Sequence, residues 1–208
     1  MNFFDVVCSR RSIRKFQDVP VPQEDIEKML RAAMSAPSAC GCQNWHFVVL
    51  QSREAIQGLA NAVEKGVKRV MHELELEDET FLSNRIKQET FFVHAPVVFA
   101  VYMEPMIYHD RRITEKLVEY GMDAEERSRF FGQPDLLTIG AAIENLLLCA
   151  HDLGYGGCWM NDPVIAAQEI DEYLGQSAPR RLISIVPVGV PAYTPREKTL
   201  RNDTVEYR

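Results

Sequence analysis

Cysteine is scarce in the sequence, and the few that occur do not form a recognisable framework. The chain of 208 residues has 5 cysteines, namely Cys8, Cys40, Cys42, Cys149 and Cys158. An odd count without framework spacing argues against a fold stapled by disulfides. Cys40 and Cys42 are the only close pair, and no second pair or histidine cluster completes a ligand set. We therefore expect no metal site.

Long hydrophobic runs and an excess of positive charge are also missing. No apolar run approaches the ~20 residues of a membrane helix, and the N-terminal MNFFDVVCSRRS lacks the basic-then-apolar order of a signal peptide. The formal net charge is -7 and the pI is near 5.3, which disfavours general attraction to nucleic acid or anionic membranes. We expect a cytoplasmic protein without nucleic-acid or membrane partners.

The hydrophobic content, 46% of the residues, is enough for a sizeable core and predicts a single domain over residues 1–208. Apolar residues at helical spacing predict helices within 20–37, 53–91 and 136–154. Short apolar runs rich in β-branched residues predict strands at 45–50, 95–103, 156–160 and 181–191. Residues 104–134 are polar and predict irregular or short helical structure. Helices alternating with four short strands indicate an α/β or α+β sheet covered by helices.

The stretch 138–153 has apolar residues around nearly its whole circumference, which predicts a buried helix. One face carries Ile139, Ala142, Ile143, Leu146, Leu147, Ala150 and Leu153. Ala141, Leu148 and Cys149 lie toward the other face. A chain of this size has difficulty burying both faces, so we expect a subunit interface and an obligate homodimer.

One short stretch is strongly basic although the chain is acidic: SRRSIRKF, residues 9–16. If residues 10–14 run extended, Arg10, Ser12 and Arg14 point to one side, because strand side chains alternate. Two guanidinium groups and a hydroxyl suit a phosphate monoester. The alternative is a solvated basic end of the preceding helix, favoured by the helix dipole.

Two further stretches carry features of a ligand site. SAPSACGCQNWHF, residues 35–47, places small residues between a helix and a strand, where backbone can approach a flat ligand. DLGYGGCWMND, residues 152–162, runs from a buried helix through a Gly-rich turn to a strand end whose amides can reach a ligand. Taken singly, the first also reads as a tight connection and the second as a helix cap and turn.

Taken in order, these motifs resemble the FMN-dependent nitroreductase family over nearly the whole chain. The matching segments are RRSIRKF, APSACGCQNWHFVVL, FFVHAPVVFAVY, IGAAIENLLLCAHDLGYGGCWM and VGVPAYTPREKTLR. The resemblance implies an α+β fold with a central mixed, mainly antiparallel sheet flanked by helices. It also implies an intertwined homodimer that binds FMN at each of two interface sites.

The resemblance further implies which residues bind the flavin. The phosphate and ribityl chain would be held by Arg10, Arg11, Ser12 and Arg14. The second subunit would lay its segment along the isoalloxazine ring through Pro37, Ser38, Ala39, Gly41 and Gln43. The strand passing the ring would supply Trp159, Met160 and Asn161, with a backbone amide at or beside Asn161 facing flavin N5. A C-terminal basic pair, Lys198 and Arg201, would close on the phosphate.

The sequence also departs from the family pattern. Gly41 stands where the family often has Asn, and Asn44 replaces the usual Pro. The C-terminal basic pair is spaced Lys-x-x-Arg, where Lys-x-Arg is commoner. Mid-chain contacts to the flavin ring stay open among four candidates, Asn61, Lys65, Lys68 and Arg69.

The implied activity is an oxidoreductase that passes hydride from NADH or NADPH through FMN to nitroaromatic, quinone or flavin-type acceptors. The cofactor carries this chemistry, so we expect no catalytic acid or base from the protein. One alternative is a specialised member of the superfamily, of dehalogenase, flavin-destroying or dehydrogenase type. Another is a non-catalytic flavin-binding protein. Specialised members differ mainly in the lid region, here 104–134, whose tyrosines, Tyr108 and Tyr120, either contact an aromatic substrate or pack; whether this region is a substrate lid stays open.

Overall fold

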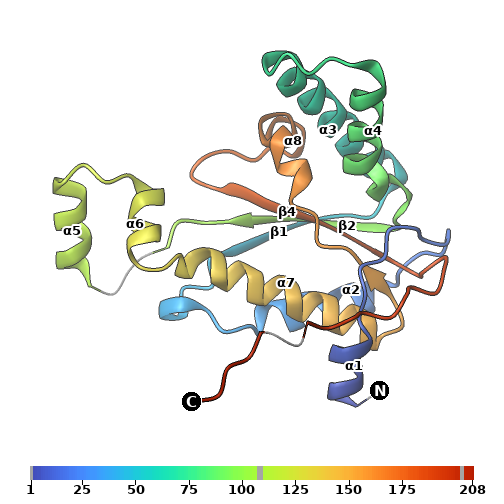
Figure 1. Ribbon diagram of the computed structural model, residues 1–208, viewed down its shortest axis with the longest axis horizontal. Coiled ribbons are helices and arrows are strands. Elements are labelled where there is room, and N and C mark those ends of the chain that lie inside the picture. Colours follow the sequence, from blue (N-terminus) through green and yellow to red (C-terminus); the bar gives the residue numbers. More distant parts are fainter. Residues whose placement is uncertain (1, 107–109, 202–203) are drawn as a thin grey trace.

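The computed structural model describes residues 2–106, 110–201 and 204–208 (Figure 1). The α-helices are α1 (Phe3–Ser9), α2 (Gln23–Met34), α3 (Arg53–Glu73), α4 (Glu79–Thr90), α5 (Arg111–Glu119), α6 (Ala124–Phe130), α7 (Pro134–Asp152) and α8 (Ala167–Leu174). The short 3-10 helices are η1 (Ala39–Gly41), η2 (Phe91–His94) and η3 (Asp162–Ala166). The strands are β1 (Trp45–Leu50), β2 (Val97–Met103), β3 (Gly156–Gly157) and β4 (Arg181–Gly189).

The four strands form one sheet in the order β1-β2-β4-β3, and each neighbouring pair is antiparallel. One isolated bridge, from Ser12 to Gly157, is parallel. The strand expected at 45–50 is confirmed residue for residue, and the one expected at 95–103 begins at Val97. The α+β class is therefore confirmed.

The strand expected at 156–160 is shorter than predicted, because β3 ends at Gly157. The next residue, Cys158, donates its N–H to the carbonyl of Pro187 at 3.2 Å. Proline has no N–H to return, so the ladder is interrupted there. It resumes at a bridge between Met160 and Ile185. The segment 158–160 thus stays along the edge of the sheet.

Alternation along β2 sends side chains to two cores, one on each face of the sheet. Val97, Phe99 and Val101 pack in the core that contains α2 and α7. Val98, Ala100 and Tyr102 pack in the core that contains α3 and α8. Figure 1 shows these two helix layers on opposite sides of the sheet. β2 is buried along its whole length, as its apolar sequence predicts.

The expected central helix is α7, and it is buried on one face within this chain. Ile139, Ile143 and Leu146 have no solvent exposure. Ala141 and Leu148 are only half-buried, and Leu137 is 69% exposed. The second apolar face of the helix is therefore left uncovered by the rest of this chain.

The polar region 104–134 contains two short helices, α5 and α6, as expected. In Figure 1 they stand apart from the helix layers, at the end of the molecule where α7 begins. Tyr120 at the end of α5 is 83% exposed, whereas Tyr108 lies outside the described residues. No helix among the described residues has the length and apolar character needed to cross a membrane.

Candidate functional site

The basic stretch runs extended along the sheet edge, as the sequence analysis expects. It leaves α1 at Arg10 (ψ 135°), and the N–H of Ile13 donates to the carbonyl of Gly157 at 2.9 Å. Ile13 is 3% exposed and points into the core, whereas Arg14 is exposed. The alternation therefore places the core on one side of the stretch and a polar surface on the other.

Three polar residues of this stretch influence the buried thiol of Cys158. Burial raises the pKa of this thiol, while Arg14, Ser12 and Arg10 act in the opposite direction. Ser12 bridges Gly157, the residue before Cys158, so the stretch runs beside the strand end. The Arg10 Nε also lies 3.2 Å from Glu144 Oε1 on α7.

Arg11 is oriented differently from its neighbours. Its guanidinium donates to the main-chain carbonyls of Cys8, Arg10 and Arg196 at 2.7, 2.7 and 3.2 Å. These bonds hold the basic stretch against the C-terminal tail. The structure therefore shows Arg11 in a structural role, and its contact with a phosphate stays a prediction.

Arg14 and the strand end share a cavity of about 530 Å³, here called the strand-end cavity. Its lining residues are Arg14, Gln88, Phe91, Cys158, Trp159, Met160, Asn161 and Asp162. Two motifs separated by more than 140 positions in the sequence thus meet at one site. Within it, Met160 is buried and Trp159 is 37% exposed.

The strand end presents free backbone donors to this cavity. Cys158 and Met160 use their N–H groups on the carbonyls of Pro187 and Ile185. Alternate N–H groups of an edge strand point the other way, and no described residue accepts from the N–H of Trp159 or Asn161. The Asn161 side chain donates to the Ile183 carbonyl at 2.8 Å, which fixes the strand end.

The segment 37–43 lies elsewhere in the same chain. The Ala39 N–H donates to Thr138 Oγ1 near the start of α7 at 3.0 Å. Pro37, Gly41 and Gln43 are exposed, and Ser38 is half-buried. None of these residues lines the strand-end cavity. Within a single chain, this segment therefore does not reach the cavity that Arg14 lines.

The backbone of this segment is unusual at its centre. Cys40 and Gln43 have φ values of 56° and 46°, in the left-handed region that glycine favours, and Gly41 follows with 63°. A non-glycine residue in this region is conformationally strained, and strained residues cluster at ligand sites, where the surrounding structure stabilises them. Cys40 and Cys42 are free thiols, and no three potential ligand side chains among the described residues are grouped closely enough to bind a metal ion.

The C-terminal basic pair lies in a tail that starts beside the basic stretch. The Tyr193 hydroxyl donates to the Ser12 carbonyl at 3.5 Å, and Arg196 accepts from Arg11. Lys198 and Arg201 follow and are exposed. Their contact with a phosphate stays a prediction.

The four mid-chain candidates lie on α3 and have other partners. Asn61 bonds Gln57, Lys68 pairs with Glu64, and Lys65 pairs with Glu172. Arg69 makes a two-pronged ion pair with the buried Glu169, at 2.7 and 3.2 Å. None lines the strand-end cavity.

The sequence analysis missed Gln88, Phe91 and Asp162, which do line the strand-end cavity. Gln88 and Phe91 come from the end of α4 and the start of η2. A single polar or aromatic position in a helix looks the same in sequence whether it faces solvent, core or ligand. Only the packing of α4 against η3 identifies them.

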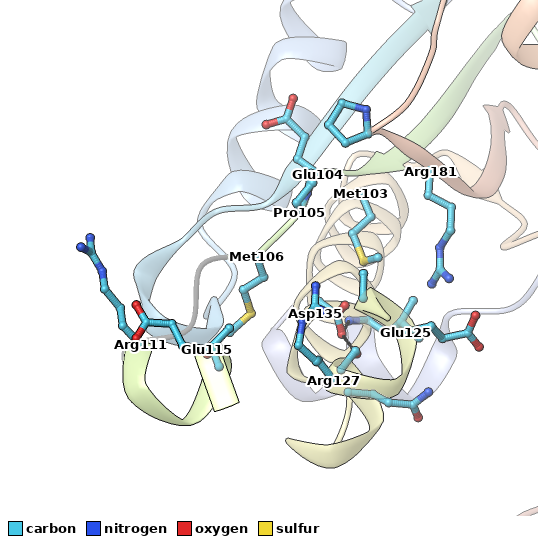
Figure 2. Close-up of a pocket in the computed structure, with 16 residues that line it drawn as sticks. Met103, Glu104, Pro105, Met106, Arg111, Glu115, Glu125, Arg127, Asp135 and Arg181 are labelled. Carbon is cyan, nitrogen blue, oxygen red and sulfur yellow. Dashed lines mark hydrogen bonds between the residues drawn. The ribbon is translucent and has the colours of Figure 1, made fainter. Parts of the chain in front are cut away.

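A second cavity, of about 510 Å³, lies between α5, α6 and the body of the molecule (Figure 2). We call it the lid cavity. Apolar lining comes from Met103, Pro105, Met106, Leu136 and Pro179. Charged lining comes from Glu104, Arg111, Glu115, Glu125, Arg127, Asp135 and Arg181. The region 104–134 thus borders a pocket, as a lid would.

The chain matches the family model described as "Nitroreductase family" over residues 7–190. A relative from Methanothermobacter thermautotrophicus, provisionally named NADH dehydrogenase/NAD(P)H nitroreductase, is 28% identical over 204 residues. That alignment covers 96% of this chain and 83% of the relative.

Solved structures share the fold. A BluB-like flavoprotein from Clostridium difficile superposes with a TM-score of 0.80 at 30% identity, covering 97% of this chain and 95% of that one. A nitroreductase with bound FMN from Bacteroides fragilis superposes with a TM-score of 0.74 at 22% identity, covering 100% and 99%. The expected nitroreductase-like fold is confirmed.

Proposed function

Because the chain belongs to the nitroreductase family, we propose that it is an FMN-dependent oxidoreductase that passes hydride from NADH or NADPH to a nitroaromatic, quinone or flavin-type acceptor. The observation that carries this proposal is the strand-end cavity, where Arg14 meets the open amide of Asn161. When bound, FMN supplies the redox chemistry, because its N5 accepts and returns hydride. The protein's own residues bind and orient it.

The donors at one end of the cavity fit the terminal phosphate of FMN. Arg14 lines the cavity, and Arg10 and Ser12 belong to the same extended stretch beside the strand end. Two guanidinium groups with a hydroxyl suit a phosphate monoester. Lys198 and Arg201, further along the tail that Arg11 contacts at Arg196, would add positive charge if the tail closes on the phosphate. The phosphates of FAD are internal and carry less charge each, so this donor set favours FMN.

The other lining groups fit the flavin ring. The N–H of Asn161 is available to N5, and the carboxamide of Gln88 can both donate to and accept from the pyrimidine edge. The cavity volume, about 530 Å³, lies in the usual range for cofactor sites. None of these groups has to act as a catalytic acid or base.

The segment 37–43 reaches a flavin only from a second copy of the chain. Its anchor on α7 at Thr138 adjoins the uncovered face of that helix, which exposes Leu137. Phe3 and Phe4 of α1 are 78% and 74% exposed, and such apolar surface marks an interface. We propose a homodimer in which each subunit covers the other's flavin ring.

Reconstitution and anaerobic titration test the proposal. The purified protein should be yellow, and mass analysis of the heat-released cofactor should show FMN. NADH or NADPH should bleach the flavin, and a quinone such as menadione should restore its colour. FAD, or no flavin after reconstitution, would contradict the cofactor assignment. Bound FMN that neither nicotinamide reduces would instead favour the non-catalytic flavin-binding alternative.

A specialised member of the superfamily would show a third pattern. NAD(P)H would bleach its flavin, but menadione and simple nitroaromatics would reoxidise it no faster than oxygen does. Rates for the three oxidants, measured on one reduced preparation, separate this alternative from a general acceptor reductase.

A further inference from the structure

The lid cavity adjoins the segment that covers the flavin ring in the proposed dimer. The N–H of Glu104 donates to the Asn44 carbonyl at 2.8 Å, and Thr138 accepts from Ala39. Asp135 and Leu136, one turn before Thr138, line the cavity. If the proposed function holds, this cavity opens beside the ring on which segment 37–43 lies, where an acceptor has to bind.

Most carboxylates of the lid cavity already have a partner. Glu104 pairs with Arg180 at 2.8 Å, and Glu125 pairs with Arg129 on its own helix. Asp135 accepts from the Ser128 hydroxyl and from the N–H of Leu136. Glu115 is the exception, since no described residue bonds its carboxylate.

Arg181, at the first position of β4, and Arg111 are the lining cations without a partner among the described residues, and both are exposed. No hydrogen bond or ion pair joins either side chain to another residue of the described ranges. Figure 2 shows Arg181 extending into the cavity beside Met103, while Arg111 and Glu115 lie on the opposite side and the Arg111 guanidinium points away. Arg127 donates to the Met122 carbonyl. An uncompensated guanidinium thus faces an apolar wall.

We propose that the lid cavity binds the acceptor, and that the acceptor has a flat apolar body with a carboxylate that Arg181 binds. A guanidinium offers a carboxylate two parallel hydrogen bonds, and the wall of Met103, Met106 and Leu136 accepts the apolar body. This inference rests on the proposed function for its place beside the flavin. The binding chemistry itself depends only on the cavity.

Three probes of one shape test it: 4-nitrobenzoate, 4-nitrobenzyl alcohol and 4-nitrobenzylamine. Their affinities are measured by calorimetry on the FMN-loaded, oxidised protein without nicotinamide. The benzoate should bind about tenfold tighter than the alcohol, the gain expected from a charged hydrogen bond. In Arg181→Gln this preference should fall to about twofold or less. Arg181→Lys keeps the positive charge but cannot make two parallel hydrogen bonds to a carboxylate, so it should give an intermediate preference for the benzoate.

Arg112→Gln is the matched control, because Arg112 is exposed on α5 and does not line the cavity. It should keep the benzoate preference of the wild type, and thermal melting checks that each variant is folded. A preference that survives Arg181→Gln overturns the proposal. So does tighter binding of the amine, which would assign recognition to Glu115, or failure of every probe to bind. Bleaching of the same preparations by NAD(P)H tests the proposed function separately.

Discussion

The N–H of Ile13 donates to the carbonyl of Gly157 at 2.9 Å, and this bond fastens the basic stretch to the edge of the sheet. The preceding glycine, Gly156, makes this close approach possible. A Cβ at Gly156 would lie 2.3 Å from Ile13 Cγ1 and 3.1 Å from Pro191 Cγ. The glycines before Cys158 therefore set the distance between the phosphate donors and the strand end.

Gly156→Ala should lower stability and flavin affinity together. The added methyl group has to displace a core side chain, Ile13, at a typical cost of about 1–3 kcal/mol for overpacking. Because Ile13 moves with Ser12 and Arg14, FMN binding should weaken as well. Urea unfolding and fluorescence titration with FMN measure the two effects. A variant that unfolds earlier but binds FMN as the wild type does would show that the two are not coupled.

Arg14→Ala should weaken FMN binding by about 1.5–3 kcal/mol, the range for a hydrogen bond to a charged group. The fold should survive, because Arg14 is exposed. Lys15→Ala is the matched control: it removes the same charge from the neighbouring exposed position, which does not line the cavity. Equilibrium titration of the apoprotein gives both affinities. Equal losses in the two variants would mean that the stretch acts only through its general charge.

Ala141→Arg should abolish dimerisation and flavin binding together. Ala141 is half-buried on the uncovered face of α7, beside the exposed Leu137. A charge buried there in an interface without a partner is severely unfavourable. Gln57→Arg, on the exposed side of α3, should leave both properties as they are. Sedimentation velocity with flavin absorbance measures mass and occupancy in one run. A monomer that holds FMN normally would defeat the proposed dimer site.

Glu89→Gln should change how stability depends on pH. Burial raises the pKa of Glu89 to about 7; Arg85 opposes this shift, and Asp162 adds to it. Arg85 forms an ion pair with Glu89, which opposes the shift without cancelling it. The folded state therefore keeps a proton that the unfolded state, with a pKa near 4.5, gives up. This stabilisation is complete below about pH 4.5 and is lost as the pH rises through 7.

Melting temperatures between pH 5 and 8.5 check this sign. Over that range the melting temperature of the wild type should fall relative to that of Glu89→Gln, by about 2–4 °C for each 1 kcal/mol lost from the free energy of unfolding. Glu79→Gln, at an exposed position of the same helix, should follow the wild type. If Glu89→Gln and the wild type change in parallel, Glu89 does not titrate in this range.

The sequence predicted the elements well where one periodicity dominates. β2 is apolar on both faces and is an inner strand of the sheet. α2 has one apolar stripe, which packs on α7. Prediction was weaker where a contact with a neighbouring strand determines the length of an element. The strand expected at 156–160 is interrupted after Gly157 because Cys158 lies opposite Pro187 of β4. No local sequence pattern near Cys158 indicates this interruption.

The candidate site divides in the same way. The extended course of residues 10–14 was accessible to sequence reasoning, because it depends only on local geometry, whereas the phosphate contacts of Arg10, Ser12 and Arg14 stay a prediction. Gln88 and Asp162 were not accessible to it, because they reach the strand-end cavity through the packing of α4 against η3. Arg69 looked available in sequence, yet Glu169, 100 positions later, holds it in an ion pair.

By itself, the sequence determined the helices α2, α3 and α7, the strands β1 and β2, the extended basic stretch and the resemblance to a family, since each depends on residues close together in the chain. Only the tertiary structure decided which motifs meet. It joined Arg14 to Asn161, kept segment 37–43 at the start of α7, and left Arg181 without a carboxylate partner among the described residues. Contacts between distant segments depend on how whole elements pack. The free energy of packing is distributed over many residues, so no single motif determines these contacts.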